Sequence, residues 1–176
     1  VSGGADNDHI WGGGSADALF GDAGDDTFAW LSGDGDDSVD GGAGIDQIQA
    51  LGDQTHSVAY TLSNGAAEVI ALAGDGPSPF SLSLTDIESI QLGGGAMDDS
   101  LTIAAGTTVS PGAATGVAFF GGDGNDNFDA ANASFNVAFA GGDGSGSATG
   151  GSGNDALEGG SGLDSLVGGA CDDILY

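Results

Sequence analysis

Apolar residues recur at a spacing of nine residues along much of the chain. Residues 41–49 read GGAGIDQIQ, residues 121–129 read GGDGNDNFD, residues 150–158 read GGSGNDALE and residues 159–167 read GGSGLDSLV. All four segments fit the pattern G-G-x-G-x-D-x-U-x, in which U is an apolar residue. A fixed period of this kind predicts that the chain is built from similar units stacked on one another.

Six looser copies keep the aspartate in sixth place and the apolar residue in eighth place. They begin at Gly3, Gly12, Gly21, Ser32, Gly94 and Gly168. The ten sixth-place aspartates are Asp8, Asp17, Asp26, Asp37, Asp46, Asp99, Asp126, Asp155, Asp164 and Asp173. The ten eighth-place residues are Ile10, Leu19, Phe28, Val39, Ile48, Leu101, Phe128, Leu157, Leu166 and Leu175. Disorder, which enrichment in glycine and aspartate alone would favour, does not explain this constant phase.

Each copy divides into a turn and a short strand. Glycine reaches backbone conformations with positive φ that side chains disfavour, so the first half of a copy is predicted to be a tight turn. The x-U-x half is predicted to be a strand whose middle residue points inward while its two neighbours face solvent. One apolar residue in nine makes a core only when coils stack, at about 4.8 Å per coil. The pattern therefore predicts an all-β fold of the β-solenoid class.

The repeat pattern divides the chain into three segments. We expect a calcium-binding repeat solenoid over residues 1–49, a strand-rich insertion without metal sites over residues 50–93, and a continuing, partly degenerate solenoid over residues 94–176. Within the last segment the repeats are concentrated at residues 121–129 and 150–176. The interruption at residues 50–93 is the longest stretch of the chain that lacks the nonapeptide.

The interrupting segment still has the pattern of β-strands. Val58, Tyr60 and Leu62 alternate with smaller residues, which predicts a strand with one buried face. The dipeptide Asn64-Gly65 follows directly and is a strong signal for a β-hairpin turn. We therefore expect strands in this segment, joined by a hairpin.

The charge of the chain limits the partners that it can bind. It contains 27 acidic residues and no lysine or arginine, which gives a formal net charge of −27. Such a chain repels nucleic acid phosphates and anionic lipid headgroups, and it has no basic side chain to bind them. Metal cations are the remaining counter-charges, and aspartate oxygens favour calcium over zinc. We therefore expect several calcium ions and no nucleic acid partner, and no apolar run is long enough to predict a membrane span.

Catalytic chemistry has little support among the residues present. His9 and His56 belong to no recognised nucleophile motif, so we expect both to be surface residues. We identify no catalytic residue and predict that the chain is not an enzyme. Cys171 is the only cysteine, so no disulfide can form within the chain. Trp11 and Phe20 stand in ninth place, which is turned outward, and are candidate contact points for a partner.

The ten nonapeptides resemble the hemolysin-type calcium-binding repeat of the RTX (repeats-in-toxin) proteins. The resemblance implies a parallel β-roll in which two nonapeptides form one coil, and calcium lies between loops on the same side, one coil apart. Sixth-place aspartates about one coil apart would then share an ion. The implied pairs are Asp8 with Asp26, Asp155 with Asp173, Asp17 with Asp37, and Asp26 with Asp46. The last two pairs are 20 rather than 18 residues apart, because two residues, Trp30 and Leu31, are inserted.

The resemblance also implies that backbone carbonyls of the turns complete each calcium shell, which needs six or more oxygens. The turn glycines expected to contribute are Gly42, Gly44, Gly122, Gly124, Gly151, Gly153, Gly160 and Gly162. In the copy at residues 141–149 Gly146 replaces the aspartate, so Asp126 and Asp164 are each expected to form a weaker site. Cys171 and Met97 stand where the pattern has its third glycine, which puts the turn geometry there in question.

These observations lead to two hypotheses about function. The first is a calcium-binding structural module of a secreted or cell-surface bacterial protein, such as an adhesin, a surface-layer component or an extracellular filament. It would leave the cell by type I secretion and fold on binding calcium outside. The alternative is a C-terminal secretion and folding appendage of an exported enzyme such as a protease or lipase. The expected partners are calcium and either other copies of the chain, stacked head to tail, or a longer parent chain.

Overall fold

The structure consists of short strands joined by turns. The computed structural model describes residues 1–52, 55–64, 70–75, 80–109 and 116–176, and over these residues the chain forms 18 strands and no helix. None of the described residues therefore belongs to a helix that could cross a membrane. Short strands separated by glycine-rich turns are what one inward apolar residue in nine predicts.

The strands form two sheets, called here sheet A and sheet B. In spatial order, sheet A contains β1 (Ser2–Gly4), β3 (Ala18–Asp22), β5 (Ser38–Asp40), β9 (Phe80–Thr85), β8 (Ile70–Asp75), β7 (Ala59–Asn64), β11 (Ser100–Ile103), β13 (Asn127–Asp129), β15 (Ser147–Thr149) and β17 (Ser165–Val167). Sheet B contains β18 (Ile174–Leu175), β16 (Ala156–Ser161), β14 (Val137–Asp143), β12 (Val117–Asp123), β10 (Ser89–Gly95), β6 (Gln47–Leu51), β4 (Thr27–Leu31) and β2 (His9–Trp11).

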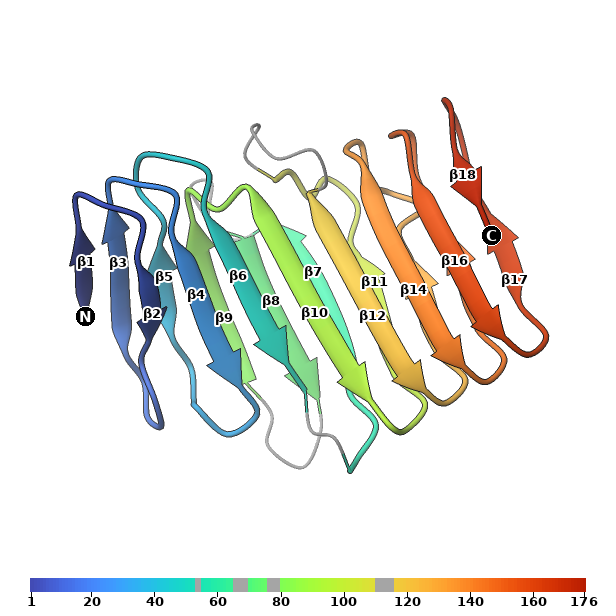
Figure 1. The fold of residues 1–176 in the computed structure, drawn as a ribbon, viewed down its shortest axis with the longest axis horizontal. Helices are drawn as coiled ribbons and strands as arrows, with labels where there is room; N and C mark the ends of the chain where they lie inside the picture. The colour runs from blue at the N-terminus through green and yellow to red at the C-terminus, as the bar shows by residue number, and fades with distance from the viewer. Residues whose placement is uncertain (53–54, 65–69, 76–79, 110–115) are drawn as a thin grey trace.

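The chain alternates between the two sheets, which lie face to face with the termini at opposite ends of the stack (Figure 1). Neighbouring strands are parallel, as in β2 with β4 and β14 with β16, except in the pairs that involve β8. A helix-free pair of largely parallel sheets, wound strand by strand, is a β-roll. The predicted fold class is confirmed.

One coil of the roll contributes a strand to each sheet, and the number of residues in a coil varies. Aspartates in equivalent turns of neighbouring coils mark the length of a coil. Asp8 and Asp26 are 18 residues apart, and Asp26 and Asp46 are 20 residues apart. The separation reaches 42 residues between Asp46 and Glu88, because the chain forms three strands of sheet A before it returns to sheet B. The strand that follows these three strands, β10, still pairs in parallel with β6.

The expected core is confirmed at the eighth place of the repeats. The buried eighth-place residues are Ile10, Leu19, Phe28, Val39, Ile48, Leu101, Phe128 and Leu157. Leu166 is half-buried, and Leu175 is 47% exposed because β18 is the outermost strand of sheet B. Trp30, one of the two inserted residues, is also buried, so it adds a second inward side chain to β4.

Between β5 and β11, sheet A contains an antiparallel meander. The strand β7 pairs with β8 in an antiparallel direction, and β8 pairs in the same way with β9. The strand β7 ends at Asn64, where the sequence predicts a hairpin, and Gly65 of that turn lies outside the described residues. In sheet B, β6 and β10 are direct neighbours, so the meander gives sheet A two more strands than sheet B. The interruption of the repeat is therefore built into the sheet.

Aromatic rings fill the core where sheet A widens. Trp30 of β4 contacts Phe80 of β9, with ring centroids 4.0 Å apart, and Tyr60 of β7 lies edge-on to Phe80 and to Phe119 at 6.2 Å from each. Phe139 of β14 continues the chain of contacts at 6.0 Å from Phe119. Aromatic side chains bury the largest areas, so they suit the region where one sheet has two more strands than the other.

Candidate calcium sites

Turns lie along two opposite edges of the roll (Figure 1). The sixth-place aspartates belong to these turns and form two columns, in which successive coils are joined by hydrogen bonds. The turns that lead into sheet B carry Asp8, Asp26, Asp46, Asp155 and Asp173. The turns that lead into sheet A carry Asp17, Asp37, Asp99, Asp126 and Asp164. Nonapeptides alternate between the two edges because each one forms half of a coil.

Within a column, each carboxylate accepts a hydrogen bond from the backbone of the preceding coil. The Asp8 N–H donates to Oδ1 of Asp26, and the Asp26 N–H donates to Oδ1 of Asp46, both over 2.8 Å. The same bond joins the other two expected pairs, Asp17 with Asp37 at 2.9 Å and Asp155 with Asp173 at 3.0 Å. The structure thus places the members of each expected pair one coil apart, in hydrogen-bond contact.

The second carboxylate oxygen of each loop points back over the first glycine of the same loop. At Gly41, for example, a Cβ atom would lie 2.7 Å from Oδ2 of Asp46, so only glycine leaves room for this arrangement. The Oδ2 atoms of four aspartates are fully buried and accept no hydrogen bond within the described structure. These four are Asp26, Asp46, Asp99 and Asp126.

Buried carboxylate oxygens without donors are costly, because an ionised group loses its hydration. Burial, with a smaller contribution from the Asp126 and Asp98 carboxylates, raises the pKa of Asp99 to about 6, against the lowering effect of the hydrogen bond from the Val58 N–H. Burial is also the main cause of the raised pKa of Asp37, Asp46 and Asp126. No lysine or arginine exists to offset this cost, so these positions are suited to a bound cation.

Backbone carbonyls run along the same edges, because glycine loops of successive coils stack closely. A Cβ on Gly42 or Gly44 would collide with the carbonyl oxygen of Asp22 or Gly24, one coil earlier. The other glycines expected to contribute carbonyls meet a carbonyl of the preceding coil in the same way: Gly122, Gly124, Gly151, Gly153, Gly160 and Gly162. Each edge therefore presents carboxylate and carbonyl oxygens side by side.

Calcium fits this donor set better than other metals. It accepts six to eight oxygen ligands from carboxylates and backbone carbonyls in flexible geometry. Among the described residues, no group of three or more histidine, cysteine, aspartate or glutamate side chains converges on one point. That finding excludes side-chain-only centres of the zinc type from the described residues, and it agrees with sites in which carbonyls supply most ligands.

Two further contacts in the columns were missed by sequence reasoning. The Asp46 N–H donates to Oε2 of the buried Glu88 over 2.7 Å, so Glu88 takes the place of a sixth-place aspartate. The Asp99 N–H donates to Oδ1 of Asp126 over 2.8 Å, across a coil of 27 residues. Glu88 precedes Ser89 and an inward Ile90, which is the spacing of D-x-U in the repeat, and this could have marked it. The expectation that residues 50–93 hold no metal site stays a prediction.

Gly146 lies between Asp126 and Asp164 in the register, as expected. Its N–H donates to Oδ1 of Asp164 over 2.8 Å, but it has no carboxylate to accept from the coil of Asp126. A different arrangement occurs at Asp155, where Oδ1 accepts from Val137 N–H and Oδ2 from Gly151 N–H. Asp155 therefore has less free acceptor capacity than the four aspartates with an unbonded Oδ2.

The two irregular turns differ from each other. Cys171 has φ +78°, a left-handed conformation that glycine takes at this place in other copies. The glycine-like turn is therefore kept there, although a side chain in this conformation is strained. Met97 does not adopt positive φ, and its carbonyl oxygen packs against the turn of Gly124, one coil later.

Sequence reasoning also missed a second ladder, at fifth place. Oδ1 of Asn7 accepts from the Asp25 N–H, and Oδ1 of Asp25 accepts from the Ile45 N–H, both over 2.9 Å. Oδ1 of Asp98 accepts from the Asn125 N–H over 2.7 Å. The frequency of aspartate and asparagine in fifth place was the available signal. These side chains tie successive turns together, so not all of the acidic residues are candidate ligands.

Comparison with protein families agrees with the repeat geometry. The family model of the RTX calcium-binding nonapeptide repeat matches residues 1–28, 31–53 and 149–176. A search of curated proteins gives no significant match. The matched segments carry most of the aspartate pairs described above, whereas Asp99 and Asp126 lie outside them. With its parallel coils, glycine turns and columns of stacked carboxylates, the chain is a β-roll, and its segments 1–28, 31–53 and 149–176 are similar to the RTX calcium-binding nonapeptide repeat.

Proposed function

We propose that the chain is a calcium-binding structural module of a secreted or cell-surface protein, which folds when it binds calcium outside the cell. The paired carboxylates of the two columns and the carbonyls of the turn glycines would hold the ions, which would supply positive charge where the chain has none. The matched repeats are calcium-binding repeats.

One observation carries the proposal. Four aspartates each bury an oxygen that accepts no hydrogen bond in the described structure, in a chain without a single basic side chain. All four also accept a backbone hydrogen bond from the preceding coil on Oδ1. Turns built in this way bring negative charges together coil after coil, and a bound cation would make that arrangement favourable.

This electrostatic argument links folding to location. In a cytosol with little free calcium, repulsion among 27 carboxylates would keep the repeats loose and suitable for export. Outside the cell, calcium at about 0.1 to 1 mM matches the affinity range of extracellular calcium modules. Folding would then be coupled to export by ion concentration alone.

Far-UV circular dichroism in chelator, followed by calcium titration, tests the proposal. We expect a disordered spectrum in chelator and a cooperative gain of β-signal as calcium rises. Magnesium at the same concentration is the matched control, because it screens charge equally well but requires stricter octahedral geometry. A β-rich spectrum that persists in chelator, or equal folding in magnesium, would contradict the proposal.

The finer roles are part of the same proposal. Stability that depends on calcium suits an adhesin, a surface-layer component or an extracellular filament, all of which work in calcium-rich surroundings. The alternative, an appendage that assists the export of a protease or lipase, requires a catalytic domain in the same gene product. The sequence of the full gene product distinguishes the two.

A further inference from the structure

The outer face of sheet B carries two adjacent rows of mostly apolar residues. One row of outward residues crosses the sheet in continuous register: Leu31, Leu51, Gly93, Phe120, Ala140 and Glu158. The adjacent outward row consists of Ala29, Gln49, Gln91, Ala118, Ala138 and Ala156. Among these residues Glu158 is the only carboxylate, although the chain has 27 acidic residues. We call these two rows the apolar face.

Large apolar side chains are exposed on this face. Leu31 is 43% exposed, Leu51 is 48% exposed and Phe120 is 50% exposed, and Tyr176 extends the first row at 79%. The outer face of sheet A carries hydroxyl side chains at many of the outward positions that the structure describes. Examples are Ser38, Ser83, Ser100, Thr102, Ser147 and Thr149. The contrast singles out one side of the roll as a contact surface.

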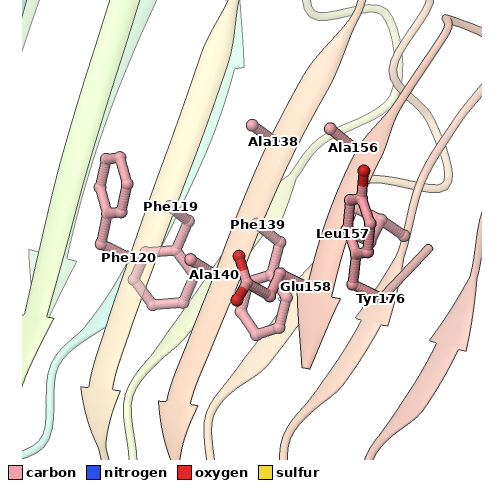
Figure 2. Close-up of a pocket in the computed structure, with 9 residues that line it drawn as sticks. All are labelled: Phe119, Phe120, Ala138, Phe139, Ala140, Ala156, Leu157, Glu158 and Tyr176. Atoms are coloured by element: carbon pink, nitrogen blue, oxygen red, sulfur yellow. The ribbon is translucent and has the colours of Figure 1, made fainter. Parts of the chain in front are cut away.

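The apolar face has a projecting part and a matching hollow. The hollow has a volume of about 210 Å³, and its floor includes Ala138, Ala140 and Ala156. Figure 2 shows these small residues between the ring of Phe120 on one side and Tyr176 on the other. A smaller hollow, of about 80 Å³, lies on the opposite side of Phe120, against Leu51 and Gly93. Phe120 therefore projects between two depressions that its own row provides.

We propose that two copies of the chain pair through their apolar faces, with Phe120 of each copy seated in the alanine hollow of the other. A two-fold axis allows this, because the projecting ring and the hollow lie on one face, so each contact occurs twice. The two B sheets would pack face to face about 10 Å apart, as in a β-sandwich. The carboxylate columns lie along the turns, so they flank this contact.

The shape of the apolar face favours a second copy as the occupant, because the same face carries both the projecting ring and the hollow. The exposed large side chains supply an apolar area on the order of 500 Å² per face, somewhat below the roughly 800 Å² per partner of a standard interface. That area predicts a reversible dimer of modest affinity. A basic or acidic partner would gain little, since the face offers Glu158 as its only charged group among the residues named above. Calcium is needed because unscreened carboxylates of two copies repel each other.

Sedimentation equilibrium in saturating calcium tests the pairing over protein concentrations of about 1 to 100 µM, the range expected for a modest interface. We expect a monomer–dimer equilibrium that stops at twice the chain mass. Phe120→Asp should weaken dimerisation at least about tenfold, since it removes a central aromatic contact and buries a charge. Ala140→Asp, which fills the hollow, should have the same effect without altering Phe120.

Phe20→Asp is the matched control, because Phe20 is 45% exposed on β3 of sheet A and the change adds the same charge. It should leave the dimer unchanged, and circular dichroism should show that all three variants fold in calcium. A monomeric wild-type chain, or a dimer that survives Phe120→Asp, would overturn the proposal. So would a monomer that binds phosphatidylcholine vesicles through Phe120, which would assign the face to lipid. Open-ended oligomers insensitive to Phe120→Asp would point instead to stacking of roll ends.

Discussion

The repeat coils and the meander hold successive strands of the roll together by different interactions. Residues 1–49 contain 11 aspartates, and their turns are tied together by carboxylate-to-backbone hydrogen bonds. Residues 55–85 contain Glu68 and Asp75 as their only acidic residues, and there the strands β7, β8 and β9 are joined by antiparallel pairing. On the proposed function, the first region would need cations to be stable, whereas the second is joined by strand pairing and buried aromatic rings.

The comparison shows that a roll can change its source of stability without losing its shape. Each repeat coil carries acidic turns, so we expect its stability to depend on the neutralisation of those turns. In the meander, Tyr60 and Phe80 contact Trp30 or Phe119 from the adjacent coils. Those contacts let the core continue across a coil of 42 residues, where the spacing of the repeat is lost.

Partial calcium removal should separate the two regions. At a calcium concentration that half-saturates the chain, we expect amide hydrogens of β2, β4 and β16 to exchange before those of β7 and β9. The reason is that the repeat strands depend on neutralised turns, whereas the meander has few charges to neutralise. Hydrogen exchange followed by mass spectrometry measures this order. Simultaneous loss of protection in all five strands would show that the roll unfolds as one unit.

Truncation of Trp30 should weaken the aromatic core without removing a calcium ligand. Trp30→Ala is expected to lower the free energy of unfolding in calcium by about 3–5 kcal/mol, because it leaves a large cavity against Phe80. The number of bound calcium ions should not change. Chemical denaturation and calorimetric titration measure the two quantities. Trp11→Ala is the control, because Trp11 is 60% exposed, and a similar loss there would argue against the cavity explanation.

Removal of one central carboxylate should affect two calcium sites. Asp26 lies one coil from both Asp8 and Asp46, so Asp26→Ala should weaken binding at both positions. Calorimetric titration should show a loss of up to two ions and a higher calcium requirement for folding. Asp40→Ala is the control, because Asp40 ends β5 at ninth place, outside the columns. Unchanged binding in Asp26→Ala would contradict the pairing of aspartates one coil apart.

Restoration of the missing carboxylate should strengthen binding by a smaller amount. A Cβ at Gly146 would meet Oδ1 of Asp164 at 3.4 Å and Phe139 at 3.6 Å, which are ordinary contact distances. Gly146→Asp should therefore fit, and it adds a carboxylate between Asp126 and Asp164. We expect calcium affinity to rise, with Gly146→Asn as the uncharged control. Equal affinities of the aspartate and asparagine variants would show that charge at this position has no role in binding.

Local periodicity was sufficient to predict most of the repeat coils. Ile10, Phe28 and Ile48 are buried and aligned, because each stands two residues after an aspartate and the pleat turns it inward. The pairing of Asp8 with Asp26 was implied by the resemblance to RTX repeats, in which two nonapeptides form one coil. The inward apolar residue and the turn aspartate each have a fixed place within the nine-residue unit. A single nonapeptide is therefore enough to identify both.

The sequence by itself determined the repeat unit and its inward side chains. Only the tertiary structure decided that Glu88 faces Asp46, that Asp99 lies beside Asp126, and that the interrupting segment forms three strands of sheet A. It also decided that Phe120 stands beside Ala140 on the apolar face. The physical reason is that register between parallel strands depends on how distant segments stack. Once the spacing departs from a regular coil, no local signal specifies which residues become neighbours.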